Sequence, residues 1–321
     1  MSVRPIPFLA AGMLALGAAP AAAQTTPEPV PEPAAGAAGY KLLGGMATKK
    51  MRYYAPSQKV VLRGRVKPAV PGEVLTLYAI RGKKASKTVR RRVGRGGRFE
   101  FRFKVGKPGV IRLVVEHRAS PGQVAFRTPR RRITVAGWQA GAGERGIKVL
   151  LLQRALLSEG FATPVTGHYD DATARGVLAF RKTNGLGRDG YATREVFAKL
   201  LRGEGAFRLR YPRAGKHVEF DWSRQVLVLA RGGKPYRTYH TSSGAPATPT
   251  VFGSYRFYYK VPGTNAKGMV HSSFFIGGYA IHGYPSVPTY PASHGCLRVP
   301  IPNALSIFNW IDIGDPIYTY R

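Results

Sequence analysis

Cysteine is nearly absent from this sequence, which holds one among 321 residues. A single thiol excludes an internal disulfide framework, a cysteine-rich zinc site and an iron–sulfur cluster. Acidic residues are also scarce, with 16 Asp and Glu against 50 Lys and Arg and a formal net charge of +34. This excess predicts an anionic partner of a kind that composition does not identify. The length predicts two or three domains, and a hydrophobic content of 44% excludes a wholly disordered chain.

The N-terminus lacks an apolar run long enough to cross a bilayer. The run from Phe8 to Ala19 has 12 residues, whereas a spanning helix needs about 20. Arg4 precedes this run and small residues follow it, which is the order of a secretory signal. We therefore expect a signal peptide over residues 1–23, with an uncleaved anchor as the alternative, followed by a Pro/Ala-rich linker over residues 24–48. The protein is expected to be exported, to the periplasm or the cell wall.

Most of the positive charge lies in one segment. Residues 49–136 contain 25 Lys and Arg against 3 Asp and Glu, a net charge of +22. Short alternating runs in this segment are separated by Gly and Pro, and Phe99, Phe101, Phe103 and Val105 share one face of such a run. This pattern predicts a β-sandwich that resembles immunoglobulin-like spacer domains. Its basic face either is simply solvated or binds an anionic wall polymer.

Residues 138–203 change to a helical period. Apolar stripes predict helices beginning near residues 147 and 173, and Thr193 is a predicted N-cap for a third. The segment also contains the motifs Val149-x-x-Leu152-Gln153-x-x-Leu156-x-x-x-Gly160, Val165-Thr166-Gly167-x-Tyr169-x-x-x-Thr173, Ala179-Phe180-Arg181 and Gly185-Leu186-x-x-Asp189-Gly190. These motifs resemble the peptidoglycan-binding type 1 domain, which implies a small three-helix fold. Arg181 and Thr166 stand where that family usually has Gln and Asp.

Residues 208–321 read mainly as strands and contain the densest chemical constellation. The only cysteine, Cys296, lies 14 residues after His282 and two after His294. A cysteine attacks an acyl carbon as the thiolate, and a histidine within reach takes and returns the proton. A solitary cysteine in an exported protein, preceded by Gly295 and accompanied by two histidines, therefore indicates a nucleophile. The alternatives are a buried apolar cysteine, a turn-capping His294, or a zinc site that adds His271.

The pattern Ile281-His282-Gly283 with Ser293-His294-Gly295-Cys296-x-Arg298 resembles the active-site signature of the L,D-transpeptidases of the YkuD family. The resemblance runs from about Val218 to Tyr320 and implies a mostly-β catalytic domain over residues 208–321. It makes Cys296 the nucleophile, His282 the general base and acid, and His294 a second active-site histidine. The residues that it assigns to the oxyanion hole and the substrate are Ser293, Gly295, Arg298 and Gly283.

Two departures concern the loop over this site. Nine residues separate Gly283 from Ser293, a short loop for the family. Gly283 stands where some members carry Ser, so we expect a backbone carbonyl to fix the imidazole tautomer. The backbone N–H groups of Gly295 and Cys296 are expected to form the oxyanion hole, and Arg298 to support the loop or to meet a substrate carboxylate.

The resemblance implies a ping-pong acyl transfer that forms 3–3 cross-links between peptidoglycan stem peptides through a Cys296 thioester. No metal or organic cofactor is implied, and carbapenems are expected to acylate Cys296. The alternatives are an L,D-carboxypeptidase, in which water replaces the amine, and a non-catalytic wall-binding protein. A secreted nucleic-acid binder is disfavoured, because residues 49–136 show no aromatic-studded binding motif and export opposes it. The expected partners are stem peptides, glycan and, through residues 49–136, anionic wall polymers.

Overall fold

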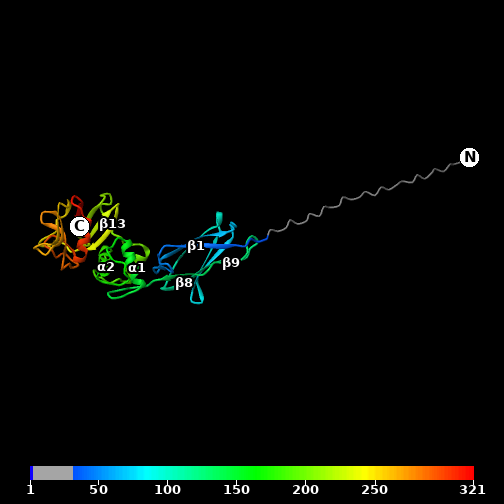
Figure 1. Cartoon of the computed structure of the whole chain (residues 1–321). Helices are drawn as coiled ribbons and strands as arrows, with labels where there is room; N and C mark the ends of the chain where they lie inside the picture. Colours follow the sequence, from blue (N-terminus) through cyan, green and yellow to red (C-terminus); the bar gives the residue numbers. More distant parts are fainter. Residues whose placement is uncertain (3–31) are drawn as a thin grey trace.

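The computed structural model describes residues 1–2 and 32–321. In the described part of the chain, a β-module, a helical domain and a C-terminal domain follow one another in sequence and in space (Figure 1). The predicted signal peptide lies almost wholly outside the described residues, and so does the first part of the predicted linker. None of the helices in residues 1–2 and 32–321 combines the length and the apolar character needed to cross a bilayer.

The β-module packs one sheet against another. The first sheet has the order β1-β4-β7, and its strands span Ala37–Leu43, Lys59–Lys67 and Arg98–Lys104. The second has the order β2-β3-β10-β8-β5-β6, with β9 beside β8. Its strands are β2 (Met46–Ala47), β3 (Arg52–Tyr54), β5 (Val74–Arg81), β6 (Lys84–Arg92), β8 (Gly109–His117), β9 (Phe126–Arg127) and β10 (Arg131–Val135).

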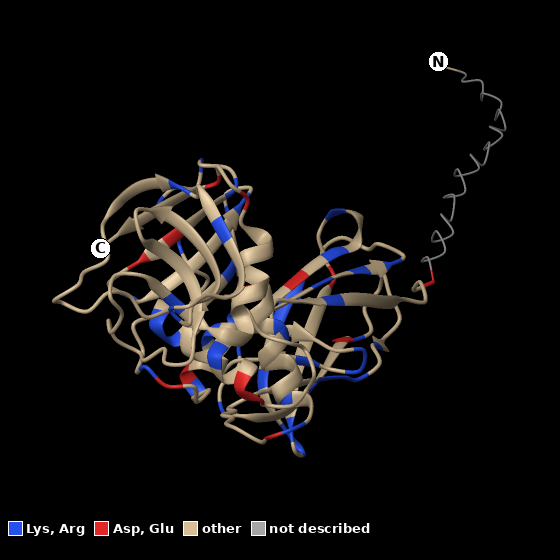
Figure 2. Cartoon of the chain, turned by 60° about the vertical axis from the view of Figure 1, so that its left-hand side comes forward, with Lys and Arg blue, Asp and Glu red and all other residues tan. Residues whose placement is uncertain are grey.

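Alternation along the strands builds the core between these sheets. Phe99, Phe101 and Phe103 of β7 are buried against Leu77 of β5 and Leu113 of β8, as the sequence pattern predicts. Basic residues take the outward positions, and β6 is exposed along nearly its whole length. In Figure 2, Lys and Arg occupy many positions on the strands of this module, whereas Asp and Glu occupy few. An immunoglobulin-like relationship for the module stays a prediction.

The prediction that the linker extends to residue 48 is wrong, because β1 and β2 lie within it. β1 pairs antiparallel with β4 over its whole length, and Tyr40 is buried in the core. The short run after Gly39 is next to Pro/Ala-rich sequence and has little strand signal of its own. Its strand conformation comes from hydrogen bonding to β4, a partner about 25 residues further along the chain.

The helical domain consists of α1 (Ile147–Ser158), α2 (Asp171–Thr183) and α3 (Arg194–Arg202). Asp170 caps α2 by accepting a hydrogen bond from the Thr173 N–H. Thr193 caps α3 through the Val196 N–H, as predicted, and α3 ends at Gly203 in the left-handed conformation. These caps fix where the connecting loops leave the helices.

Arg181, which departs from the family pattern, is a buried structural residue. Its guanidinium donates to the carbonyls of Gly187 and Tyr191 and to the Asp189 carboxylate, at 2.6–2.8 Å. The arginine at this position therefore holds the loop between α2 and α3 in place.

The C-terminal domain carries two further sheets. One has the order β13-β12-β11-β19-β14, with β11 (His217–Asp221), β12 (Val226–Arg231), β13 (Lys234–His240), β14 (Gly253–Arg256) and β19 (Pro316–Tyr320). The other has the order β15-β16-β17-β18, with β15 (Tyr259–Thr264), β16 (Val270–Ile276), β17 (Tyr279–Tyr284) and β18 (Leu297–Pro300). Helix α4 (Ile301–Trp310) packs on β16 and β17.

Candidate active site

A cavity of about 570 Å³ opens beside β17 and β18. It contains every titratable residue of the predicted catalytic set. Its walls are formed by Asn265, Ala266, Lys267, Met269, Phe274, Gly278, His282, Tyr284, Ser293, His294, Cys296 and Arg298. Mostly apolar walls with a few convergent polar groups are typical of a ligand-binding cavity.

Strand pairing brings the two ends of the motif to this cavity. β17 and β18 are parallel neighbours, and His282 is paired with Arg298 in their register. The loop that follows β17 therefore returns to the same sheet, and it places Cys296 directly before β18. His282 and Cys296 line one wall although 14 positions separate them in the sequence.

The His282 imidazole is held in one tautomer. Its ring is 3% exposed, and Nδ1 donates to the Gly283 carbonyl over 2.9 Å. A backbone carbonyl fixes the ring, as the absence of a serine at position 283 led us to expect, and it leaves Nε2 as the proton acceptor. Burial lowers the pKa of His282, the Gly283 carbonyl opposes that shift, and the Arg298 charge adds to it. His282 is thus a neutral base at neutral pH.

Cys296 is partly buried, and its Sγ donates to the Gly278 carbonyl over 3.6 Å. Burial raises the pKa of the thiol, while a hydrogen bond from the Ala280 backbone and the charges of Arg298 and Lys267 lower it less. Because the pKa of the cysteine rises and that of the histidine falls, the cavity holds a neutral thiol and a neutral imidazole at neutral pH.

The turn before Cys296 is built around the Ser293 hydroxyl. This hydroxyl donates to the Cys296 carbonyl over 2.6 Å and accepts the Gly295 N–H over 3.1 Å. The Gly295 N–H is therefore occupied, and it is not a free oxyanion donor in this conformation. Within residues 32–321, the N–H groups of His294 and Cys296 make no hydrogen bond. They are the backbone donors that remain available beside the Cys296 thiol.

Gly295 allows the chain to pass under an aromatic ring. Its φ is +111°, and a Cβ there would overlap the Tyr279 ring. The Gly295 carbonyl accepts the Thr250 hydroxyl over 2.6 Å, and that hydroxyl also accepts the Gly244 N–H over 2.9 Å. Thr250 and Tyr279 therefore support the turn that precedes Cys296. Sequence reasoning gave neither of them a role, because their contacts span 45 and 16 positions.

Arg298 supports the loop and also faces the cavity. Its guanidinium lies 4.1 Å from the centre of the Tyr284 ring and donates to the Ala292 carbonyl over 3.3 Å. The Tyr284 ring meets the His282 ring edge to face, at 5.7 Å between centroids. His294 is exposed and reaches the same cavity. Tyr284 was missed because an aromatic residue at a strand end gives no catalytic signal.

Gly283 and His271 have roles other than those first considered. A Cβ at Gly283 would lie 2.7 Å from the Ala304 Cβ of α4, so a glycine is required for helix packing. His271 does not line the cavity; its Nδ1 accepts the Gly263 N–H instead. Among the described residues, no three His, Cys, Asp or Glu side chains are grouped as metal ligands.

The helical domain contacts the loop between β17 and β18. Arg188, from the loop that Arg181 holds, donates to the Thr289 carbonyl over 2.6 Å. Buried Lys182 of α2 contacts His240 Nδ1 at 2.8 Å, and His240 Nε2 donates to the Val287 carbonyl over 2.8 Å. Residues 285–292 are thus attached to the neighbouring domain directly at Thr289 and indirectly, through His240, at Val287.

Comparison with known proteins agrees with this geometry. Residues 215–319 match the L,D-transpeptidase catalytic domain of the YkuD family, and residues 145–200 match a putative peptidoglycan binding domain. A solved L,D-transpeptidase from Xylanimonas cellulosilytica is 33% identical, with a TM-score of 0.52, over 58% of this chain and 98% of that chain. Another, from Stackebrandtia nassauensis, is 18% identical, with a TM-score of 0.36, over 57% and 95%. No curated protein matches the chain.

Proposed function

We propose that this chain, which belongs to the L,D-transpeptidases with a YkuD catalytic domain, joins peptidoglycan stem peptides by 3–3 cross-links through a Cys296 thioester. The observation that carries the proposal is the cavity shared by the only cysteine and a neutral, tautomer-fixed histidine. The wall as the place of action is supported by the second match, to a peptidoglycan binding domain.

In the first half-reaction Cys296 attacks the carbonyl carbon of the third, L-configured residue of a tetrapeptide stem. His282 Nε2 takes the thiol proton as the C–S bond forms. The tetrahedral oxyanion is met by the N–H of Cys296, with the N–H of His294 as a second donor after a small turn of the loop. When the C–N bond breaks, His282 returns the proton to the departing D-Ala amine.

In the second half-reaction an amine takes the place of D-Ala. The side-chain amine of another stem attacks the thioester, His282 accepts its proton, and Cys296 leaves as the thiol. Arg298 and Lys267 line the cavity as cations and attract carboxylates of the stem. Neither half-reaction requires a metal or an organic cofactor.

Water is the competitor for the thioester. If water reaches it faster than the amine does, the same residues make an L,D-carboxypeptidase. Export, wall localisation and acylation of Cys296 by carbapenems belong to the same proposal. A protein that only binds the wall is disfavoured, because Cys296 and His282 share one cavity and the Ser293 hydroxyl holds the turn before Cys296.

The test is incubation of the purified protein with a disaccharide-tetrapeptide, followed by mass spectrometry. Cross-linked dimer with release of D-Ala supports transfer, tripeptide alone supports hydrolysis, and no product refutes both enzyme functions. Cys296→Ala and His282→Gln should abolish product, and His271→Gln, outside the cavity in the same domain, should retain it. An active Cys296→Ala protein would contradict the assignment of the nucleophile.

A further inference from the structure

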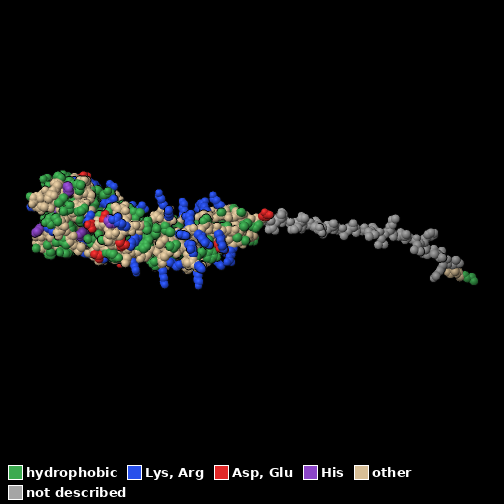
Figure 3. All heavy atoms as spheres, turned by 60° about the horizontal axis from the view of Figure 1, so that its bottom comes forward, with side chains coloured by type: hydrophobic (Ala, Val, Ile, Leu, Met, Phe, Trp, Pro, Cys, Tyr) green, Lys and Arg blue, Asp and Glu red, His purple; other side chains and the backbone are tan. Residues whose placement is uncertain are grey.

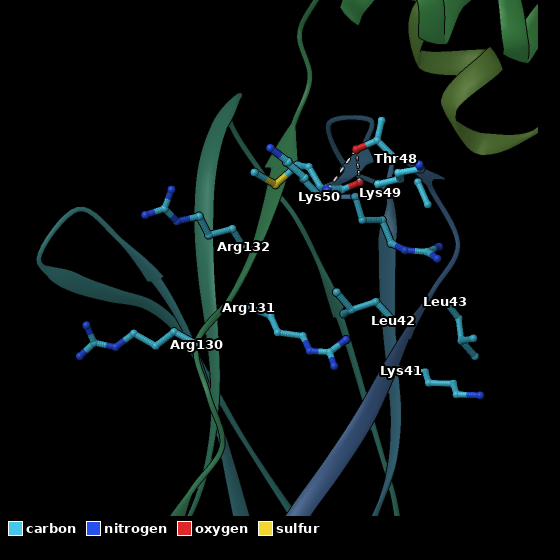
Figure 4. A pocket seen from close by; sticks show the side chains of 12 residues that line it. Lys41, Leu42, Leu43, Thr48, Lys49, Lys50, Arg130, Arg131 and Arg132 are labelled. Carbon is cyan, nitrogen blue, oxygen red and sulfur yellow. Dashed lines mark hydrogen bonds between the residues drawn. The ribbon is translucent and has the colours of Figure 1, made fainter.

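A second cavity lies in the β-module, at the open end between its sheets. It has a volume of about 720 Å³, and we call it the basic groove. β1 forms one side, β3 and β10 form the other, and the turn between β2 and β3 closes one end (Figure 4). Its lining residues are Lys41, Leu42, Leu43, Ala47, Thr48, Lys49, Lys50, Met51, Arg52, Arg130, Arg131 and Arg132.

The lining of the basic groove is cationic and has no counter-charge. Seven of its twelve residues are Lys or Arg, and none is Asp or Glu. Within residues 32–321 none of these cations takes part in an ion pair, although Arg63 and Arg127 elsewhere in the module do. Like charges gathered at a concave surface repel one another, and an arriving polyanion relieves that repulsion.

Two of the cations are held in position by the module itself. Arg131 lies 5.2 Å from the centre of the Tyr40 ring, and in Figure 4 its side chain extends toward Leu42 across the groove. Arg52 donates one N–H to the Gly44 carbonyl over 2.5 Å. Each guanidinium keeps further N–H groups free for an anion, because arginine carries five.

The lining also indicates what kind of polyanion fits. It contains no aromatic side chain, so it offers no surface for base stacking, on which single-stranded nucleic acid binding depends. Such a surface suits charged groups repeated along a flexible backbone. Figure 3 shows the basic side chains gathered over the β-module, while histidines appear on the C-terminal domain at the other end of the molecule.

We propose that the basic groove binds an anionic polymer of the cell wall through phosphate or carboxylate groups repeated along its backbone. The identity of the polymer rests on the wall location proposed above, whereas binding itself is independent of catalysis. The groove would hold the enzyme on one polymer while the distant cavity acts on stem peptides.

The test uses the full chain with Cys296→Ala, so that catalysis plays no part. Fluorescence anisotropy measures binding of labelled poly(glycerol phosphate), polygalacturonate and oligo-dT from low to high salt. The groove variant is Arg130→Gln with Arg131→Gln and Arg132→Gln. The matched control is Arg90→Gln with Arg91→Gln and Arg92→Gln, which removes three exposed, unpaired arginines from β6 of the same sheet.

We expect the groove variant to bind the wall-type polyanion at least about tenfold more weakly at 0.15 M salt. Its log–log salt slope should fall by about 2, the value for three lost contacts on a flexible polyanion. The control should change affinity by less than about threefold. Binding of phosphate or of carboxylate polymer identifies which group is recognised.

Three results would overturn the proposal. Equal losses in both variants would show a diffuse field rather than a groove, and absence of polymer binding would refute it directly. Tighter binding of oligo-dT, with the same loss in the groove variant, would assign the groove to nucleic acid. The same two triple variants are also made with Cys296 retained. If both still form product at the wild-type level, a failure of polymer binding is separate from a failure of the proposed reaction.

Discussion

Replacing Lys182 by methionine should change how stability depends on pH. Lys182 is 3% exposed, and its Nζ contacts His240 Nδ1 and the Thr241 carbonyl, at 2.8 and 3.0 Å. Burial, with a smaller effect of the Arg188 charge, lowers the pKa of Lys182 to about 6. Burial also lowers the pKa of His240, to about 3. The domain interface is therefore built around an uncharged lysine at neutral pH.

The sign and size of the effect follow from proton binding. Between about pH 6 and 10.5 the unfolded chain holds a proton on Lys182 that the folded protein lacks, so stability rises with pH in this window. One proton corresponds to about 1.4 kcal/mol per pH unit, or about 3 kcal/mol between pH 7 and pH 9. His240 acts in the same direction between about pH 3 and 6.5.

The methionine variant loses that dependence on pH. At pH 7 the variant avoids the free energy of about 5 kcal/mol that the wild type spends on deprotonating Lys182. This gain offsets a loss of about 1–3 kcal/mol for each buried acceptor left unpaired, namely His240 Nδ1 and the Thr241 carbonyl. At pH 9 the avoided cost is only about 2 kcal/mol, so the variant becomes the less stable protein. The difference in unfolding free energy between variant and wild type should change by about 3 kcal/mol between the two pH values.

Urea unfolding followed by tryptophan fluorescence at pH 7, 8 and 9 measures this difference. Lys234→Met, which removes an exposed lysine from β13, the strand that carries His240, is the control and should track the wild type. If Lys182→Met and wild type show parallel pH profiles, Lys182 is charged in the folded protein and the reasoning fails.

Four further predictions concern the active site and the loop between β17 and β18. The iodoacetamide reaction of Cys296, the only thiol, should titrate above free cysteine, since burial raises its pKa, and a lower midpoint would indicate a resting thiolate. In a plot of kcat/KM against pH, the fall on the acid side should lie below pH 6.5. Activity is lost only when His282 becomes protonated, and its pKa is lowered by burial. Gly295→Ala should reduce kcat/KM at least about 100-fold by pushing the nucleophile's turn away from Tyr279, with melting used to verify the fold. Arg188→Ala should lower kcat about tenfold by releasing the loop over the site, and Arg188→Lys should recover part of it; an unchanged kcat would show that the loop holds without it.

That Cys296 and His282 meet at one cavity could be predicted because their chemistry is visible in single residues. One cysteine in the whole chain and a histidine 14 positions earlier define the pair, and strand pairing then places both on one cavity. Local signals such as the Thr193 cap and the alternating Phe residues of β7 were also predictable, since their partners lie within a few positions or share one face.

Most of the rest depends on contacts between distant positions, and one case depends on competition within a turn. β1 is a strand because β4 pairs with it, and the Lys182–His240 contact joins residues 58 positions apart. Gly295 was expected to offer its N–H to the oxyanion, but the nearby Ser293 hydroxyl accepts that N–H. Several acceptors can take one backbone N–H in such a turn, and only the three-dimensional structure shows which of them is bound.

The Lys182–His240 contact also affects how such a protein can be recombined. A catalytic domain that begins near residue 208 contains His240 but not the lysine beside it, and the segment that carries the Arg188 anchor is also missing. Such a piece would retain its nucleophile yet leave a buried imidazole nitrogen and a loop carbonyl without donors. Exchange of this domain between relatives would therefore require exchange of α2 and the loop after it. The segment that must be exchanged as one piece is therefore longer than the catalytic domain alone.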